Sequence, residues 1–162
     1  MARLEGIPPT NTLWRISNYA DLSGEGARKS TGRWHTRGRP VVYLSDSAAN
    51  GMLEQIVHLQ DGSGKLPQFY DLLRIVVSGS PEVQELFPLA HMAWKEDVEL
   101  TRRLGDAWLA SSETPLARVP SVIVPHTWNY LLNPLHPDAG KVQIAEVIRE
   151  RFDNRLFGLG AQ

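Results

Sequence analysis

The sequence predicts a single α+β domain in which central β-strands are flanked by helices. Two observations lead to this prediction. Short apolar, β-branched runs bounded by turn residues recur along the chain, as is typical of strands, and they do not alternate strictly with helical segments, as they would in a βαβ series. The length of 162 residues, with 42% apolar and 22% charged residues, suits one globular domain spanning residues 1–162.

Six apolar runs are expected to form strands. The run at 69–77 is the longest and is expected to be central in the sheet. Pro120 separates two of the C-terminal runs and marks a bulge or an edge position, because proline cannot donate to a strand ladder. The expected strands cover residues 13–17, 41–44, 69–77, 116–119, 121–124 and 142–148.

Two helices are predicted from capping residues and apolar spacing, and a short third helix is expected to start at Ser80-Pro81. Ser47 can cap a helix that runs to about Leu59, and another helix covers 97–111. On the helix after Ser47 the apolar residues fill one broad arc, so the polar positions opposite are expected to face solvent. A loop folded over that polar face would instead make it one wall of a cleft. These polar positions are Asn50, Glu54 and His58.

The segment 20–40 is rich in glycine and basic residues and has no clear periodicity. Long loops of this kind are usually functional or disordered, so it is either a solvated basic loop or a wall of a site for a phosphate-bearing ligand. It lacks the Gly-Lys-Ser/Thr ending of a Walker loop. Residues 129–138 are expected to form a polar, turn-rich segment.

Composition excludes several classes of protein. The formal net charge of −1 gives no argument for binding nucleic acid or an anionic membrane. The chain has no cysteine, which excludes disulfides, cysteine nucleophiles and cysteine-ligated metals. No run suits a signal peptide or a membrane span, so a soluble cytoplasmic protein is expected. The histidines are too scattered for a zinc site, and no Gly-x-Ser-x-Gly hydrolase motif occurs.

The remaining candidates for chemistry are a glutamate, two arginines, a tyrosine and a serine. The glutamate has no obvious second carboxylate for the usual glycosidase scheme, but it can stabilise an oxocarbenium ion or activate an acceptor. Guanidinium groups bind phosphate oxygens, and a tyrosine ring stacks on a flat heterocycle. The set suits a glycosidic bond within a phosphorylated ligand such as NAD, although the first arginine also reads as a surface strand residue. The candidates are Arg15, Arg33, Tyr43, Glu54 and Ser121.

Short motifs spread in order over nearly the whole chain resemble the RES domain family. They are Trp14-Arg15, Gly32-Arg33-Trp34, Val42-Tyr43-Leu44, Glu54, the Gly-Asp-x-Trp at 105–108, Val119-Pro120-Ser121, the segment 129–134 and His136-Pro137. The family is named after an arginine, a glutamate and a serine. Glu54 and Ser121 match the last two, and both Arg15 and Arg33 match arginine positions. His35 departs from the asparagine expected after Arg-Trp.

The resemblance implies a toxin of a bacterial type II toxin–antitoxin pair whose fold is similar to that of ADP-ribosyltransferase toxins. Such toxins destroy cellular NAD by hydrolysis or phosphorolysis, so NAD is a substrate and no cofactor is required; some members instead ADP-ribosylate a protein. Glu54 would then be the principal catalytic carboxylate, assisted by Arg33 and Tyr43. Arg15 and Arg33 would bind the NAD phosphates, Tyr43 would stack on the nicotinamide or its ribose, and Ser121 would hydrogen-bond in the nicotinamide pocket.

The partner implied by the resemblance is an Xre-like antitoxin with a helix-turn-helix domain that binds DNA. The toxin chain itself is expected to bind neither nucleic acid nor membrane. Because helix-turn-helix proteins usually dimerise, a symmetric complex with two toxin copies is expected. An acidic group of the antitoxin is expected to pair with Arg15 and Arg33 and displace NAD. An inactive binding module is a further alternative, against which the intact candidate residues argue.

Overall fold

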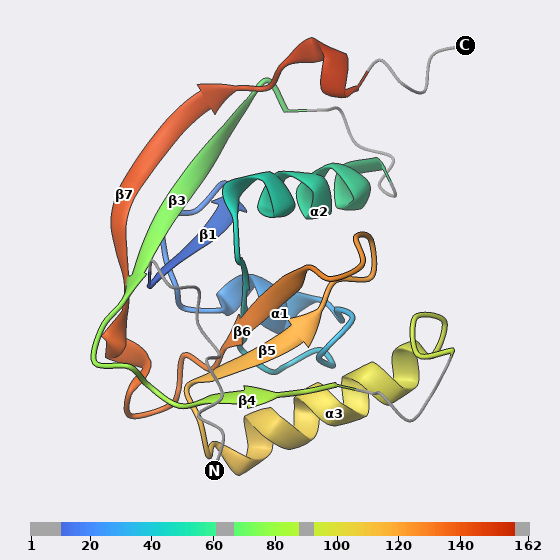
Figure 1. Ribbon diagram of the computed structural model, residues 1–162, viewed down its shortest axis with the longest axis vertical. Coiled ribbons are helices and arrows are strands. Elements are labelled where there is room, and N and C mark those ends of the chain that lie inside the picture. Colours follow the sequence, from blue (N-terminus) through green and yellow to red (C-terminus); the bar gives the residue numbers. More distant parts are fainter. Residues whose placement is uncertain (1–10, 61–66, 88–92, 158–162) are drawn as a thin grey trace.

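Seven strands pair into one sheet in the order β4-β5-β6-β2-β1-β3-β7 (Figure 1). The computed structural model describes residues 11–60, 67–87 and 93–157. Neighbouring strands in these ranges are antiparallel except for β4 and β5, which are parallel. The elements are β1 Thr12–Ser17, α1 Glu25–Lys29, β2 Val42–Ser45, α2 Ala48–Gln60, β3 Phe69–Val77, β4 Val83–Glu85, α3 Val98–Ser111, β5 Leu116–Pro120, β6 Trp128–Leu132 and β7 Val142–Arg151, with 3-10 turns at Ala139–Lys141 and Asn154–Leu156.

This mixed sheet with separate helices confirms the predicted α+β class. Two of the expected elements are wrong. The helix expected from Ser80 is absent from this part of the described chain, because Gly79 and Ser80 both have left-handed φ values, 66° and 43°, whereas an N-cap residue is extended. The strand expected at 121–124 is instead a bend, in which the Ser121 hydroxyl accepts from the backbone N–H groups of Ile123 and Val124. Such local bonds compete with a strand ladder.

The segment expected to be turn-rich begins with a strand, β6, which pairs with both β2 and β5. Its apolar residues Tyr130, Leu131 and Leu132 are all buried. The polar residues of the segment concealed this strand from sequence reasoning, because Asn-Pro and His-Pro pairs favour turns. The loop 20–40 likewise contains the short helix α1.

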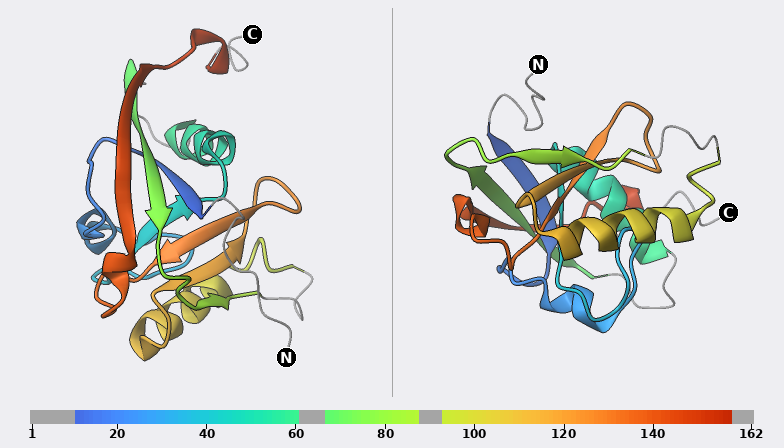
Figure 2. Two further views of the ribbon diagram at one scale, coloured as in Figure 1. Left: turned by 60° about the vertical axis from the view of Figure 1, so that its left-hand side comes forward. Right: turned by 90° about the horizontal axis from the view of Figure 1, so that it is seen from below.

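Each face of the sheet buries its own apolar cluster, because successive residues of a strand point to opposite faces. Val42, Leu44 and Leu132 belong to a cluster that also includes residues of β1, β3 and β7. Leu131 belongs to a second cluster, which includes Trp108 of α3 and Trp34 of the segment before β2. Figures 1 and 2 show α2 beside β1 and α3 at the β4–β5 end of the sheet. None of the helices in the described ranges is long and apolar enough to cross a membrane.

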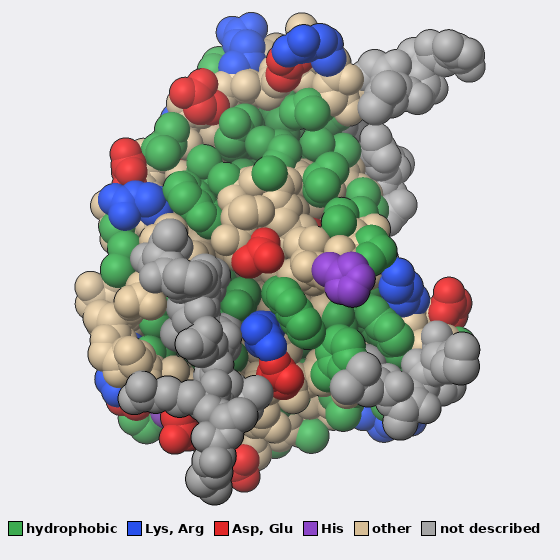
Figure 3. Space-filling view, in the orientation of Figure 1, with side chains coloured by type: hydrophobic (Ala, Val, Ile, Leu, Met, Phe, Trp, Pro, Cys, Tyr) green, Lys and Arg blue, Asp and Glu red, His purple; other side chains and the backbone are tan. Residues whose placement is uncertain are grey.

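Helix α2 is rotated relative to the arrangement that its apolar arc predicts. Leu53 and Val57, from that arc, are 44% and 39% exposed, whereas Asn50, from the polar face, is 4% exposed. Figure 3 shows hydrophobic side chains gathered on the surface in the region of α2. Burial of a polar side chain is tolerated when its hydrogen bonds are satisfied, and the sheet supplies acceptors for the amide of Asn50. Asn50 and Glu54, from the polar face of α2, therefore point toward β6. The sheet, and not a loop folded over the helix, covers this part of the polar face.

Candidate functional site

Helix α3 holds the backbone of residues 32–36 in place. The hydroxyl of Thr101 donates to the carbonyl of Arg33 at 2.7 Å, and Nε of Arg102 donates to the carbonyl of Gly32 at 2.9 Å. One turn further on, the Asp106 carboxylate accepts from the backbone N–H and the hydroxyl of Thr36, at 3.0 and 2.8 Å. This segment is consequently anchored to a helix on one side and leads directly into β2 on the other.

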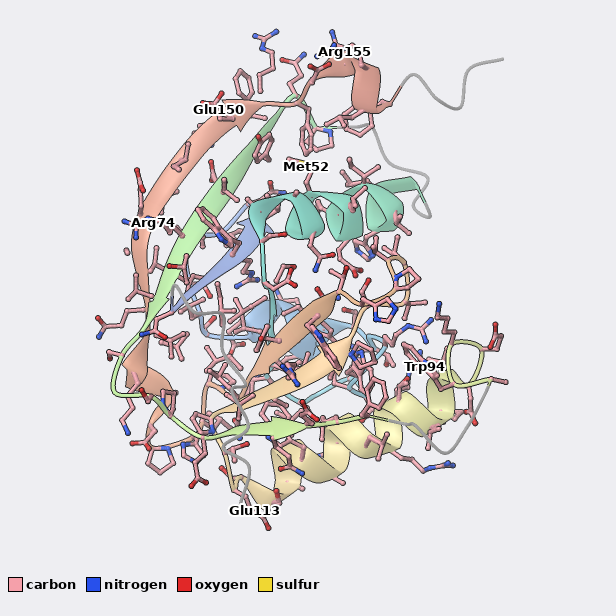
Figure 4. The ribbon with its side chains drawn as sticks, viewed as in Figure 1. Met52, Arg74, Trp94, Glu113, Glu150 and Arg155 are labelled. Atoms are coloured by element: carbon pink, nitrogen blue, oxygen red, sulfur yellow. The ribbon has the colours of Figure 1, made fainter. Side chains whose placement is uncertain are left out.

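The guanidinium of Arg33 extends from this anchored segment beside the carboxylate of Glu54. Its Nη1 donates to the backbone carbonyl of Lys95 at 2.9 Å, which leaves other N–H groups for a ligand. Burial lowers the pKa of Arg33 from its ordinary value, and the nearby Glu54 charge opposes that shift. Trp94, labelled in Figure 4 before α3, packs near Trp34 with ring centroids 6.5 Å apart.

Tyr43 offers its ring to the site but not its hydroxyl. The phenol oxygen accepts from the backbone N–H of Trp34 at 3.1 Å and lies 2.8 Å from Nδ1 of His35. Nε2 of His35 lies 3.0 Å from the carbonyl oxygens of both Ala27 and Ser30, so it carries the hydrogen and Nδ1 accepts from Tyr43. Burial raises the pKa of the Tyr43 phenol well above its usual range. The phenol thus stays protonated, and Tyr43 lines the cavity with its hydroxyl bonded to Trp34 and His35.

Glu54, in the second turn of α2, has two unequal oxygens. Its Oε1 accepts from Nδ2 of Asn129 at 2.7 Å and from the hydroxyl of Ser121 at 2.9 Å. No donor from the described residues reaches Oε2, which is consequently available to a ligand. Ser121 is only 3% exposed, and its oxygen also accepts from two backbone N–H groups. The serine therefore supports the carboxylate rather than facing the cavity.

These residues surround a cavity of about 330 Å³. Its lining combines a guanidinium and a carboxylate with apolar side chains, a combination typical of small-molecule sites. Among the described residues, no group of three acidic or histidine side chains could hold a metal ion. The lining residues are Arg33, Trp34, Tyr43, Glu54, Val57, His58, Pro120, Val122, Ile123 and Asn129.

Arg15 is not brought to this cavity. On β1, Trp14 lies opposite Ser45 and Arg15 lies opposite Leu73, so Arg15 points to the face that buries Leu73, away from Ser45 and Tyr43. Its Nη1 donates to the backbone carbonyl of Asp21 at 2.8 Å. Burial lowers the pKa of Arg15, and the charge of Asp21 opposes that shift. The expectation that both arginines would order one phosphate site is therefore corrected, because strand alternation separates them.

Sequence reasoning missed the amides that support the carboxylate. The sequence places Asn129 in the motif at 129–134 but does not connect it with Glu54, and the apolar arc predicts a solvent-facing position for Asn50. The signal in the sequence is a polar residue within an otherwise apolar strand, which requires a partner when it is buried. The position of Val122 and Ile123 in the cavity lining was also missed, because a strand was expected over these residues.

Comparison with known proteins adds to this geometry. Residues 12–153 match the model of the family described as RES domain. The chain is 46% identical over 147 residues to Toxin Res of Pseudomonas putida, covering 90% of this chain and 99% of that protein. It is 36% identical over 160 residues to the Prs ADP-ribosylating toxin of a Sphingobium species, covering 91% and 98%. A chain in the crystal structure of the M. tuberculosis MbcT–MbcA toxin–antitoxin complex shares the fold, with a TM-score of 0.73 at 24% identity, over 96% of this chain and 92% of that one.

Proposed function

The chain belongs to the RES domain family, and we propose that it is the toxin of a toxin–antitoxin pair that degrades NAD by cleaving the bond between nicotinamide and ribose. Relatives of this chain are named as toxins, and a protein of the same fold was solved in a toxin–antitoxin complex. The growth arrest caused by such a toxin would follow from loss of cellular NAD.

The observation that carries the proposal is the held carboxylate of Glu54 beside Arg33 in a small cavity. Two donors occupy Oε1, at 2.7 and 2.9 Å, and Oε2 remains for the substrate. When the bond from ribose C1′ to the nicotinamide nitrogen breaks, its electron pair goes to the ring, which leaves neutral, and positive charge develops on the ribose. A fixed carboxylate stabilises that charge because it needs no reorganisation at the moment of reaction.

The remaining residues suit the rest of the dinucleotide. A cavity of about 330 Å³ is at the lower limit for small-molecule sites, so we infer that it holds the nicotinamide riboside end. Tyr43 stacks on the nicotinamide or its ribose, and Arg33 binds a phosphate through a bidentate contact. Water or inorganic phosphate then attacks C1′, yielding ADP-ribose or its 1-phosphate. Arg15 stabilises the loop that follows β1 and does not contact NAD.

The protein partner that suits this function is an Xre-like antitoxin with a helix-turn-helix domain, in a symmetric complex with two toxin copies. An acidic group of the antitoxin pairs with Arg33 at the mouth of the cavity and excludes NAD. This chain contributes no contact to DNA, as its net charge of −1 suggests.

A second candidate function is transfer of ADP-ribose to a protein. It is favoured by the relative named as a Prs ADP-ribosylating toxin, which is 36% identical to this chain. The same cleavage at C1′ serves both activities, and they differ only in the acceptor. The exposed apolar side chains Leu53 and Val57, beside the cavity, offer a surface on which a protein acceptor could bind.

The test is NAD consumption by the purified protein, with and without phosphate, for wild type, Glu54→Gln and Glu113→Gln. Glu113 is an exposed carboxylate below α3 in Figure 4, remote from α2, and its variant is the matched control. We expect Glu54→Gln alone to lose at least 100-fold in rate, about 2.7 kcal/mol of transition-state stabilisation. Labelled NAD with purified Prs and with lysate separates the two acceptors. No NAD loss and no labelled protein with the wild type would reject both functions.

A further inference from the structure

We propose that Asn50 is a positioning residue for the reaction, acting through Asn129 to hold the Glu54 carboxylate with Oε2 toward the substrate. This inference rests on the proposed function for its kinetic consequence and on geometry alone for its structural one. Asn50 does not line the cavity, so it exerts its effect on the substrate through two intervening side chains.

Asn50 lies in the first turn of α2, soon after β2 ends. Its backbone N–H donates to the hydroxyl of Ser47 at 3.1 Å, and its side chain is 4% exposed. The amide Nδ2 lies within reach of three acceptors: Oδ1 of Asn129 at 2.9 Å, the Trp128 carbonyl at 3.2 Å and the Asp46 carboxylate at 3.2 Å. These acceptors determine which end of the amide faces β6, because the opposite orientation would place Oδ1 against three oxygens.

The orientation of Asn129 follows from that of Asn50. Oδ1 of Asn129 accepts from Nδ2 of Asn50 and from the hydroxyl of Ser45, at 2.9 and 3.2 Å. Its Nδ2 is thereby directed to Oε1 of Glu54 at 2.7 Å. If the amide of Asn129 turned over, its carbonyl would meet the carboxylate and repel it. The donors of Asn50 and Ser45 to Oδ1 of Asn129 thus fix the direction in which Nδ2 of Asn129 donates, which is toward Glu54.

The cost of this arrangement argues that it serves more than folding. Oδ1 of Asn50 is buried and has no hydrogen-bond partner among the described residues. An orphaned buried acceptor is unfavourable and rare in native proteins, and an apolar residue at this position would avoid it. What an apolar residue could not supply here is the donor to Asn129. The bond from Asn50 to Asn129 and the bond from Asn129 to Glu54 run donor to acceptor through the Asn129 amide, so they polarise and strengthen each other.

The kinetic test compares Asn50→Ala with Asn133→Ala in the NAD assay. Asn133 is the matched control, because it is a buried amide, 3% exposed, just past β6, and it hydrogen-bonds Ser112 and the backbone of Leu135. We expect Asn50→Ala to lower kcat about 10- to 100-fold with KM within about twofold, since a misplaced catalytic group can cost this much. Asn133→Ala should keep its kcat. Retention of kcat in Asn50→Ala, or an equal loss in both variants, would overturn the proposal.

The structural test is the crystal structure of Asn50→Ala, which does not depend on activity. We expect the Asn129 amide to turn or shift and its contact with Oε1 of Glu54 to be lost. An unchanged Asn129–Glu54 contact would reject the positioning role even if kcat falls. If the wild type cleaves no NAD, the proposed function fails, and this structural arm still decides the role of Asn50. Should Asn50→Ala not fold, Ser45→Ala removes the other donor to Asn129 and is expected to lower kcat about threefold to tenfold.

Discussion

At the scale of the residue, two arginines that look equivalent in the sequence have different surroundings. Arg33 lines the same cavity as Glu54, and its Nη1 donates to the backbone carbonyl of Lys95. Arg15 leaves the opposite face of the sheet and donates to the carbonyl of Asp21. Both are basic residues in or near a strand, and only the direction in which each side chain points distinguishes the arginine that lines the cavity from the one that does not.

We therefore predict that Arg33→Gln changes the KM for NAD and that Arg15→Gln changes the free energy of unfolding. Arg33→Gln should raise KM for NAD at least tenfold with little change in the free energy of unfolding, because one charged contact to phosphate is removed. Arg15→Gln should lower the free energy of unfolding by about 1 kcal/mol through the lost bond to the Asp21 carbonyl, with KM unchanged. Steady-state kinetics and urea unfolding measure the two quantities. A raised KM in Arg15→Gln would contradict the conclusion that Arg15 lies on the other face of the sheet, away from the cavity.

At the scale of the element, α3 supports the backbone segment that carries Arg33. Gly105 faces the backbone of Trp34 so closely that an added Cβ would lie 1.8 Å from its carbonyl oxygen. Thr101 and Arg102, one turn earlier, bond the carbonyls of Arg33 and Gly32. The Gly-Asp-x-Trp motif therefore has a structural role. Its glycine permits close contact between α3 and the backbone of Trp34, Asp106 accepts hydrogen bonds from Thr36, and Trp108 packs in the apolar cluster that contains Leu131.

Gly105→Ala should consequently destabilise the protein although alanine is the better helix former. The added methyl group would clash with backbone and force α3 away from Trp34, which we expect to cost about 3 kcal/mol, more than the gain of about 1 kcal/mol in helix propensity. Gly26→Ala in α1 is the control, since nothing lies within 4 Å of its added Cβ, and it should be neutral or slightly stabilising. Urea unfolding measures both. Equal stability of the two variants would contradict the close packing of α3.

At the scale of the whole molecule, one sheet carries both apolar clusters. Leu131 and Leu132 are adjacent in β6, yet they belong to the clusters on opposite faces. The strands that bear Tyr43 and Asn129 are the neighbours β2 and β6, near the middle of the sheet. Neither cluster can come apart without breaking strands that the other cluster needs, so the site depends on the integrity of the complete sheet.

This arrangement predicts a single cooperative unfolding transition for the chain. Tryptophan fluorescence reports on all five tryptophans, which include Trp34 and Trp108 in one cluster and Trp128 packed against the other. Its urea midpoint should equal that of far-UV circular dichroism, which reports on the sheet. Leu73→Ala, at a position that is 0% exposed in the other cluster, should shift both curves together, by about 2–5 kcal/mol. A shift in one curve without the other would mean that the clusters unfold separately.

Sequence reasoning predicted most elements because local patterns dictate them. The apolar runs gave β1, β2, β3, β5 and β7, and the capping residues gave α2 and α3. It failed where side-chain bonds over long distances decide the outcome. Asn129 suggested a turn in isolation, but its amide binds Glu54 and Asn50 instead, so the backbone around it is free to form β6. Likewise, Ser121 was expected to extend a strand, but its hydroxyl bends the chain.

What the sequence by itself determined is the α+β class and the family, since these depend on residue types, their order and short-range periodicity. The tertiary structure alone decided which of those residues meet. It brings Arg33, Tyr43 and Glu54 to one cavity, turns Arg15 to the other face and adds the amides of Asn50 and Asn129. The reason is physical: periodicity tells which residues share a face of one element, whereas the pairing of strands and the rotation of a helix depend on partners distant in the sequence.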